Sequence, residues 1–118
     1  AAGYLGVMGT GFVFLTCNTT NTAPGANGHG SRLGAVQGTM AANSYGWFQI
    51  FGKGNIRSLA SAAKGTRLNC TATAGAVDDD GTAGTEVLNG LTLGTATGGA
   101  TAINADAYFN YPSVGATL

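Results

Sequence analysis

Glycine recurs every few residues through most of the chain, and this spacing constrains the fold more than any other feature. The 118 residues include 21 Gly, and a Gly inside a helix costs about 1 kcal/mol relative to Ala. No segment keeps an apolar stripe at helical spacing over several turns. The best helical candidate is the short segment 58–64, SLASAAK, which ends at Gly65. The sequence therefore favours short strands separated by turns.

Short apolar runs bounded by Gly, Asn, Asp and Thr predict a series of strands. Such a series is typical of a small all-β barrel or sandwich. We therefore expect one antiparallel β domain over residues 1–118, with long loops and little or no helix. The predicted strands are 9–17, 33–39, 45–51, one that begins near Asn55, 67–73, 86–93 and 107–111.

Two segments lie outside this strand pattern. Residues 1–8 precede the first predicted strand and are a candidate N-terminal arm. Residues 18–31 form a polar stretch that contains Pro24 and His29. This stretch is long for a loop in a compact domain, so we expect it to be mobile or to reach a partner.

The segment 45–51, YGWFQIF, contains the densest group of large side chains. As a strand, it would place Trp47, Gln49 and Phe51 on one face and Gly46, Phe48 and Ile50 on the other. Both faces would then be mainly apolar, unlike those of a sheet with one face in water. Two explanations fit: a central strand covered by its own chain, or a strand whose second face another subunit covers. Either predicts that Trp47→Ala impairs folding or assembly.

The predicted strand 107–111 is similar, because it contains two tyrosines and Tyr is favoured at protein interfaces. The polar loop and the cation beside it add further candidates for contact with a neighbouring chain. The predicted interface residues are Tyr45, Trp47, Phe48, Phe51, Tyr108, Tyr111, His29 and Arg32.

Charge is scarce and balanced: five Lys and Arg residues oppose five Asp and Glu residues. Nucleic-acid binding needs several cations to neutralise phosphates, and polybasic membrane attachment needs a basic cluster. The apolar run 4–15 is too short to span a bilayer. We therefore expect no nucleic-acid or membrane partner. Gly, Ala and Thr fill 57 positions, which indicates a thin core that association with other chains supplements.

Few residues have the chemistry of a catalytic or metal site. His29 lies in a Gly-rich loop without a nucleophile-elbow motif. The run Asp78–Asp80 lacks the spacing of a calcium loop and fits a turn. Cys17 and Cys70 show no CxxC spacing, and are two small buried hydrophobes or a disulfide pair. We predict no catalytic residue, no cofactor and no metal.

Several short sequence motifs follow one another along the chain: NSYGWFQ at 43–49, GTRL at 65–68, TATAGAVDD at 71–79, GLTLGTA at 90–96 and AYFN at 107–110. In this order they resemble small capsid decoration proteins, also called cement or head-stabilising proteins, of tailed bacteriophages. The resemblance covers residues 33–114. Each of these motifs is a strand with a turn and contains no catalytic or metal-binding pattern. The resemblance therefore rests on the order and spacing of the motifs.

The resemblance implies a β-barrel or β-sandwich subunit on the capsid exterior of a virion. The implied partner is the major capsid protein, and self-association is expected as a trimer or, alternatively, a dimer. Two other interpretations stay open. One is another virion structural subunit, such as a minor capsid or tail-tube protein. The other is a carbohydrate-binding β module that uses exposed aromatic side chains such as Tyr45, Trp47 and Tyr108.

Overall fold

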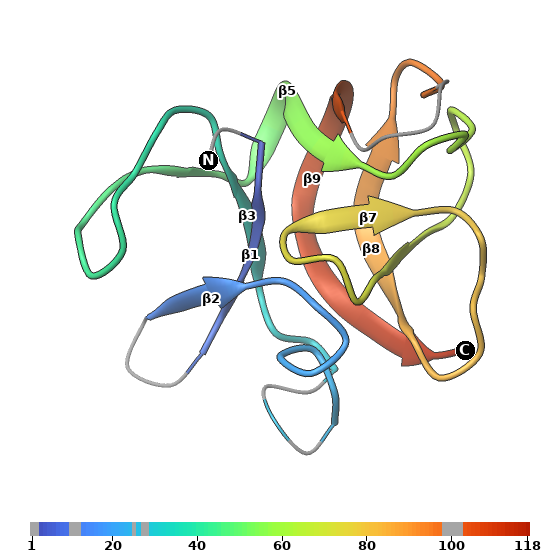
Figure 1. The fold of residues 1–118 in the computed structure, drawn as a ribbon, viewed down its shortest axis with the longest axis horizontal. Helices are drawn as coiled ribbons and strands as arrows, with labels where there is room; N and C mark the ends of the chain where they lie inside the picture. The colour runs from blue at the N-terminus through green and yellow to red at the C-terminus, as the bar shows by residue number, and fades with distance from the viewer. Residues whose placement is uncertain (1–2, 10–12, 25, 27–28, 98–102) are drawn as a thin grey trace.

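A computed structural model describes residues 3–9, 13–24, 26, 29–97 and 103–118 of the chain (Figure 1). These residues form β-strands and no helix, so the expected all-β class is confirmed. The strands are β1 (Leu5–Met8), β2 (Phe14–Thr16), β3 (Leu33–Val36), β4 (Phe48–Gln49), β5 (Phe51–Ser58), β6 (Leu68–Cys70), β7 (Ala76–Asp78), β8 (Glu86–Leu93) and β9 (Ile103–Thr117).

Five strands form a closed barrel in the order β5-β7-β6-β8-β9. Neighbouring strands are antiparallel except for the short parallel pairing of β5 with β7. β9 closes the barrel, because it pairs with both β5 and β8, and Figure 1 shows it curving strongly. Tyr111 of β9 has a positive φ of 48°. It lies opposite the register shift between Asn89 and Leu91 of β8, where the ladder is irregular.

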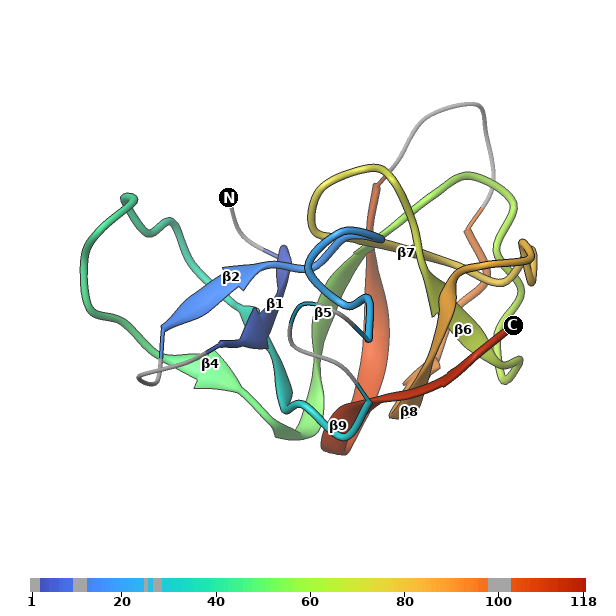
Figure 2. The same ribbon diagram turned by 90° about the horizontal axis from the view of Figure 1, so that it is seen from below.

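The other strands form an antiparallel sheet in the order β2-β1-β3-β4, which we call the four-stranded sheet. Both views show it beside the barrel (Figures 1 and 2). Backbone hydrogen bonds join the two parts: the Leu5 N–H donates to Gly75 O at 3.0 Å, and the Arg57 N–H donates to Gly3 O at 2.7 Å. The sheet also contributes buried side chains to the core of the barrel, namely Leu5, Val7, Leu33 and Ala35.

β1 corrects the expectation of an N-terminal arm over residues 1–8. Residues 5–8 form an inner strand of the four-stranded sheet, and Leu5 and Val7 are fully buried. Alternate residues of a strand point to the same face, so β1 covers the barrel with its apolar side. The strand expected over 9–17 is likewise replaced by the shorter β2. Residues 1–2 and 10–12 lie outside the described part of the chain.

The expectation of one covered strand over 45–51 is wrong. β4 covers Phe48–Gln49, β5 begins at Phe51, and residues 41–47 are exposed and outside any strand. Trp47 is 94% exposed, and Tyr45 is fully exposed. A short apolar run has the same composition in a buried strand and in an exposed binding loop, so composition could not separate them.

The candidate helix over 58–64 is also wrong. Ser58 ends β5, and Ser61 has a positive φ of 63°, which the interior of a helix does not use. The Ala62 N–H donates to Thr97 Oγ1 at 2.8 Å instead of to a helical carbonyl. This tertiary contact outweighs the weak helical preference of the Ala-rich segment.

The remaining predicted strands recur with changed bounds. The strand expected over 86–93 is β8 with the same ends, and 107–111 lies within the longer β9. Those at 33–39 and 67–73 are shorter, as β3 and β6, while β5 extends on both sides of Asn55. β7 was not predicted, because its first part lies in a Gly-Ala segment without strand signals.

The outer face of the four-stranded sheet is built around two glycines. Gly6 of β1 and Gly34 of β3 are register partners. The rings of Phe14 and Phe48, from the two edge strands, stack with their centroids 4.1 Å apart. A Cβ at Gly6 would lie 3.1 Å from Phe14 Cδ1, and one at Gly34 would lie 2.9 Å from Phe48 Cβ. The missing side chains therefore make room for the stacked rings.

Candidate functional site

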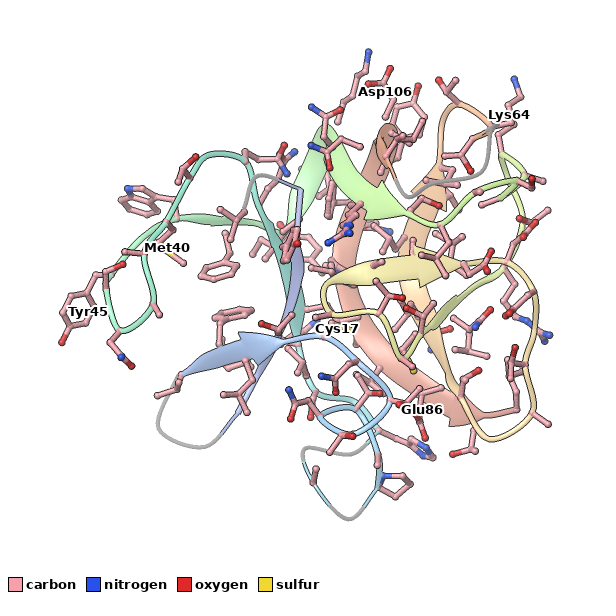
Figure 3. The ribbon with its side chains drawn as sticks, in the orientation of Figure 1. Cys17, Met40, Tyr45, Lys64, Glu86 and Asp106 are labelled. Atoms are coloured by element: carbon pink, nitrogen blue, oxygen red, sulfur yellow. The ribbon has the colours of Figure 1, made fainter. Side chains whose placement is uncertain are left out.

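Among the described residues, the two most exposed aromatic side chains lie on residues 37–47, between β3 and β4, which we call the aromatic loop. Tyr45 is fully exposed and Trp47 nearly so. The loop projects away from the barrel, with Tyr45 at its far end (Figure 3). Met40 folds back onto Gly46, where a Cβ would overlap its sulfur atom. The aromatic loop thus presents both rings to solvent.

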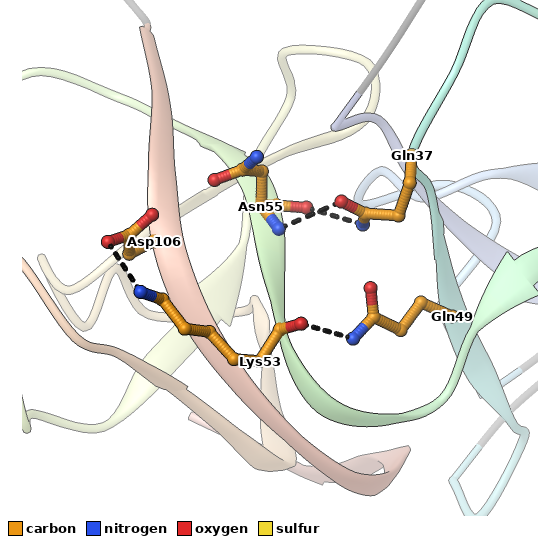
Figure 4. A network of polar contacts seen from close by, with 5 residues as sticks. All are labelled: Gln37, Gln49, Lys53, Asn55 and Asp106. Carbon is orange, nitrogen blue, oxygen red and sulfur yellow. Dashed lines mark hydrogen bonds and ion pairs between the residues drawn. The ribbon is translucent and has the colours of Figure 1, made fainter.

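Two glutamines hold the base of the aromatic loop against β5 (Figure 4). Gln37 Nε2 donates to Asn55 O at 2.9 Å, and Gln37 Oε1 accepts from the Asn55 N–H at 2.9 Å. Gln49 Nε2 donates to Lys53 O at 2.7 Å, and Gly54 leaves room for this amide. β7 pairs only with the last two residues of β5. The glutamine amides therefore take the place of a neighbouring strand and fix both ends of the loop.

A second group of predicted residues surrounds an apolar groove of about 210 Å³ where the four-stranded sheet meets β9. The ring centroids of Phe51 and Tyr111 are 5.3 Å apart, and both side chains are more than half exposed. Arg32 Nη1 donates to Tyr111 O at 3.2 Å. Met8 and Ile50 line the groove together with Arg32 and Tyr111. The structure thus brings three predicted interface residues together.

The other predicted interface residues lie apart from these groups. Phe48 is half-buried in its ring stack on the outer face of the four-stranded sheet. Tyr108 lies on the outer face of β9, opposite Thr92 of β8. His29 Nε2 lies 3.1 Å from Thr117 Oγ1, near the end of β9. The eight predicted residues therefore occupy several parts of the surface instead of one cluster.

Sequence reasoning missed a buried polar cluster centred on Glu86, which is 1% exposed. Its carboxyl oxygens lie 3.1 Å from Thr22 Oγ1 and 3.2 Å from Thr117 Oγ1. Cys70 Sγ lies 3.5 Å from Glu86 Oε2. Because Thr117 also contacts His29, the cluster ties both ends of the segment 18–31 to one carboxyl group. A signal was present, since strand alternation places Glu86 on the same inward face as the apolar Leu88.

This cluster bears on the expectation that the segment 18–31 is mobile or reaches a partner: its described residues contact the barrel, while contact with a partner stays a prediction. Thr22 is fully buried, and the Thr22 N–H and hydroxyl both donate to Asn18 O, at 3.1 and 2.8 Å. Figure 3 shows Glu86 beside this segment. The described part of the loop is therefore anchored to the barrel. Residues 25 and 27–28 lie outside the described part.

The cysteines are free and fully buried, which fits their interpretation as small hydrophobes. Burial raises the pKa of the Cys17 thiol far above its ordinary value, and the neighbouring Cys70 and Glu86 raise it further. Burial also raises the pKa of Cys70, although the hydrogen bond from Thr22 opposes this shift. Both thiols stay protonated near neutral pH, so neither is prepared to act as a nucleophile.

The acidic run 78–80 leads into a hydrogen-bonded turn. Asp80 Oδ2 accepts from Thr82 Oγ1 at 2.6 Å, and Asp80 Oδ1 accepts from Asn69 Nδ2 at 3.0 Å. The bond from Thr82 holds the pKa of Asp80 below its ordinary value, whereas burial raises the pKa of Asp78. Among the residues that the structure describes, no three His, Cys, Asp or Glu side chains are grouped as metal ligands would be.

No helix in the described ranges is long and apolar enough to cross a membrane. Comparison of the chain with protein-family models, curated proteins and solved structures finds no match. Function therefore has to be inferred from the surface of this chain itself.

Proposed function

We propose that this protein is a structural protein of the virion: a capsid decoration protein that binds the outer surface of a phage head and stabilises the lattice of the major capsid protein. The aromatic loop carries the proposal. Trp and Tyr are enriched among the residues that dominate binding energy at protein interfaces. Trp47 and Tyr45 are almost wholly exposed on a loop whose two ends are fixed to β5. Binding by such a loop costs little conformational freedom.

Two other features support binding to protein. The formal net charge is zero, so this chain gains little from nucleic acid or anionic membranes. Two of the motifs that resemble phage decoration proteins lie in defined parts of the fold. The motif at 43–49 lies on and just after the aromatic loop, and the motif at 71–79 contains β7. We assign self-association to a trimer in preference to a dimer, and the exposed pair Phe51 and Tyr111 supports contact between copies.

Stabilisation of the head would follow from mass action. Each copy that binds the assembled lattice and not the separated subunits lowers the free energy of the lattice relative to its disassembled state. Many weak contacts repeated over a lattice then add up to a large effect without any catalytic residue.

The test uses phage heads assembled without this protein, to which purified chain is added. We expect the chain to co-sediment with the heads and to raise the temperature at which they release DNA. Trp47→Ala should weaken binding about tenfold or more, as expected for a central interface aromatic. Tyr108→Ala is the matched control. The sequence also predicted Tyr108 as an interface residue, but it lies on the barrel outside the aromatic loop, so we expect its loss to leave head binding unchanged. Binding that is absent in the original chain, or equally strong in Trp47→Ala, would overturn the proposal.

The alternative assignments give different outcomes in the same assay. A minor capsid or tail-tube subunit would bind tails or would be needed before head assembly, and would not add to finished heads.

Light scattering of the free protein checks the trimer: a mass that stays at 11.6 kDa at all concentrations would contradict self-association.

A further inference from the structure

A second concave surface lies on the barrel, away from the aromatic loop. It is a shallow groove of about 470 Å³ over the outer faces of β8 and β9, and the loop before β6 forms its rim. We call it the β8–β9 groove, and its lining includes Asn89, Thr92, Tyr108 and Asn110 from these strands and Arg67 from the loop. Its volume falls within the range of about 300–1,000 Å³ that is typical of small-ligand sites.

Tyr108 forms an aromatic platform in this groove. Its ring leans toward Gly94, which directly follows β8, and an added Cβ at Gly94 would lie 2.7 Å from Tyr108 Cε2. The absence of a side chain at Gly94 thus makes room for the ring. More than half of the Tyr108 side chain remains exposed. A ring supported from below and open above can stack against a flat apolar face of a ligand.

Polar side chains without protein partners line the same groove as the ring. In the described part of the chain, Asn89, Thr92, Asn110 and the guanidinium of Arg67 make no side-chain hydrogen bond or ion pair with the protein. Two amides and a hydroxyl on two paired strands, together with the guanidinium of Arg67 in the loop before β6, offer both donors and acceptors. Register places Thr92 directly opposite Tyr108, so the ring and the polar groups lie on one surface.

We propose that the β8–β9 groove binds a neutral oligosaccharide. A pyranose ring has one face of C–H groups, which fits an exposed tyrosine ring, and an equatorial set of hydroxyls, which fits amides and hydroxyls on either side. Strand faces of small barrels are used for oligosaccharide binding in other folds. A single-stranded nucleic acid also stacks on aromatic rings, but a protein that binds it needs several cationic side chains along the phosphate backbone. Arg67 is the one cation among the described residues that line the groove.

This inference does not depend on the proposed capsid function. The test is an NMR titration of the ¹⁵N-labelled protein with linear oligomers of α1,4-glucose, β1,4-glucose, β1,4-N-acetylglucosamine and α1,6-mannose, each taken to saturation or to its solubility limit. We expect at least one oligomer to shift the amide signals of Thr92, Tyr108 and Asn110 in a saturable way, with a dissociation constant on the order of 1 mM. Tyr108→Ala should weaken that binding about tenfold.

Tyr45→Ala is the matched control, because it removes a more exposed tyrosine from the aromatic loop and should leave the sugar affinity unchanged. Unfolding midpoints of both variants establish that they are folded. Three results would overturn the inference: no saturable shift with any oligomer, equal losses in the two variants, or shifts produced by a single-stranded oligonucleotide and not by sugars. Trp47→Ala and Tyr108→Ala also separate the two proposals, since the first should affect only head binding and the second only sugar binding.

Discussion

The barrel and the four-stranded sheet differ in how their strand edges are covered. Every barrel strand pairs with a strand on each side over at least part of its length, whereas β2 and β4 are open edges of the sheet. The sheet also exposes large apolar side chains beside these edges: Val13 and Leu15 near β2, and Trp47 and Ile50 near β4. Closure removes edges, while an open edge is available to a partner. From this comparison we expect the barrel to supply most of the stability, and under the proposed function the open edges of the sheet are the surface available for association.

The two regions nevertheless share one core. Leu5, Val7 and Leu33 of the sheet are fully buried in the same cluster as Ile56 and Leu68 of the barrel. The inner face of the sheet is therefore part of the folded unit, and only its outer face and edges are free. Changes at inner positions, and at Gly6 and Gly34 beneath the stacked rings, should act on folding, whereas changes at the exposed residues beside the edges should act on binding.

The largest effect is expected from Leu68→Ala in the barrel. Leu68 is fully buried, so truncation leaves a cavity and should lower the free energy of unfolding by about 2–5 kcal/mol. Leu15→Ala on the edge strand β2 is the matched control, because that side chain is 40% exposed, and it should cost less than about 1 kcal/mol. Urea unfolding of both variants measures the difference. Equal losses of unfolding free energy in the two variants would contradict the proposed difference between the barrel and the edge of the sheet.

The next effect is expected from Glu86→Ala, which removes the anchor of the segment 18–31. The hydroxyls of Thr22 and Thr117 lose their shared partner, so the free energy of unfolding should fall by about 1–3 kcal/mol. Hydrogen exchange should then become faster in residues 18–22, while that of β5 stays slow. Faster exchange throughout the barrel would show that Glu86 supports the whole fold and not this loop.

Gly6→Ala tests the outer face of the sheet. The new methyl group would crowd the Phe14 and Phe48 rings and should cost about 1 kcal/mol. Gly38→Ala is the control, because nothing lies within 4 Å of a Cβ there and its φ is not positive. That variant should be neutral or slightly stabilising. Thermal unfolding compares the two, and a loss in Gly38→Ala as large as in Gly6→Ala would contradict the role of the stacked rings.

The carboxyl groups of Asp80 and Asp78 should make the stability of the fold depend on pH in opposite directions. The variants Asp80→Asn and Asp78→Asn test this. The folded-state pKa of Asp80 is lowered, so its carboxylate stabilises the fold above the ordinary value of 3.8, and this contribution is lost as the pH falls through the folded-state pKa. The pKa of Asp78 is raised, so its favourable contribution exists at low pH and is lost as the pH rises. At neutral pH, Asp80→Asn should destabilise the protein by less than about 1 kcal/mol.

Urea titrations at neutral pH and at about pH 2 check both signs. The loss in Asp80→Asn should disappear in acid, and Asp78→Asn should be no less stable than the original chain at neutral pH. If Asp80→Asn remains less stable than the original chain in acid, the loss of stability comes from the missing hydrogen-bond acceptor for Thr82 and not from the missing charge.

The smallest effect on folding is expected from Trp47→Ala. The side chain is 94% exposed, so the free energy of unfolding should change by less than about 0.5 kcal/mol. This reverses the folding half of the expectation drawn from the sequence, while the effect on assembly stays a prediction. Calorimetry of the free variant is the measurement. A large drop in its melting temperature would mean that the aromatic loop packs on the chain and is not a free surface.

The sequence predicted the all-β class and several strands because their signals are local. The alternation around Leu68 and Cys70 and the run from Glu86 to Leu93 can be recognised without knowing what packs on them. Tyr45, Tyr108 and Tyr111, which the sequence predicted as interface residues, are exposed, and their role at an interface stays a prediction. Tyr45 lies in a loop and not in the strand that the sequence predicted. Which of these residues lie close together could not be predicted from the sequence, because it depends on contacts between distant segments.

What the sequence determined by itself was the choice of strands over helices, which follows from frequent glycine, and the neutral charge, which disfavours polyanionic partners. Only the tertiary structure decided where the large side chains lie. It placed Leu5 inside and Trp47 outside, although both belong to short apolar runs. It also brought Thr22 and Thr117 to Glu86. The physical reason is that burial and hydrogen bonding depend on which strands become neighbours, and local residue preferences carry no information about that pairing.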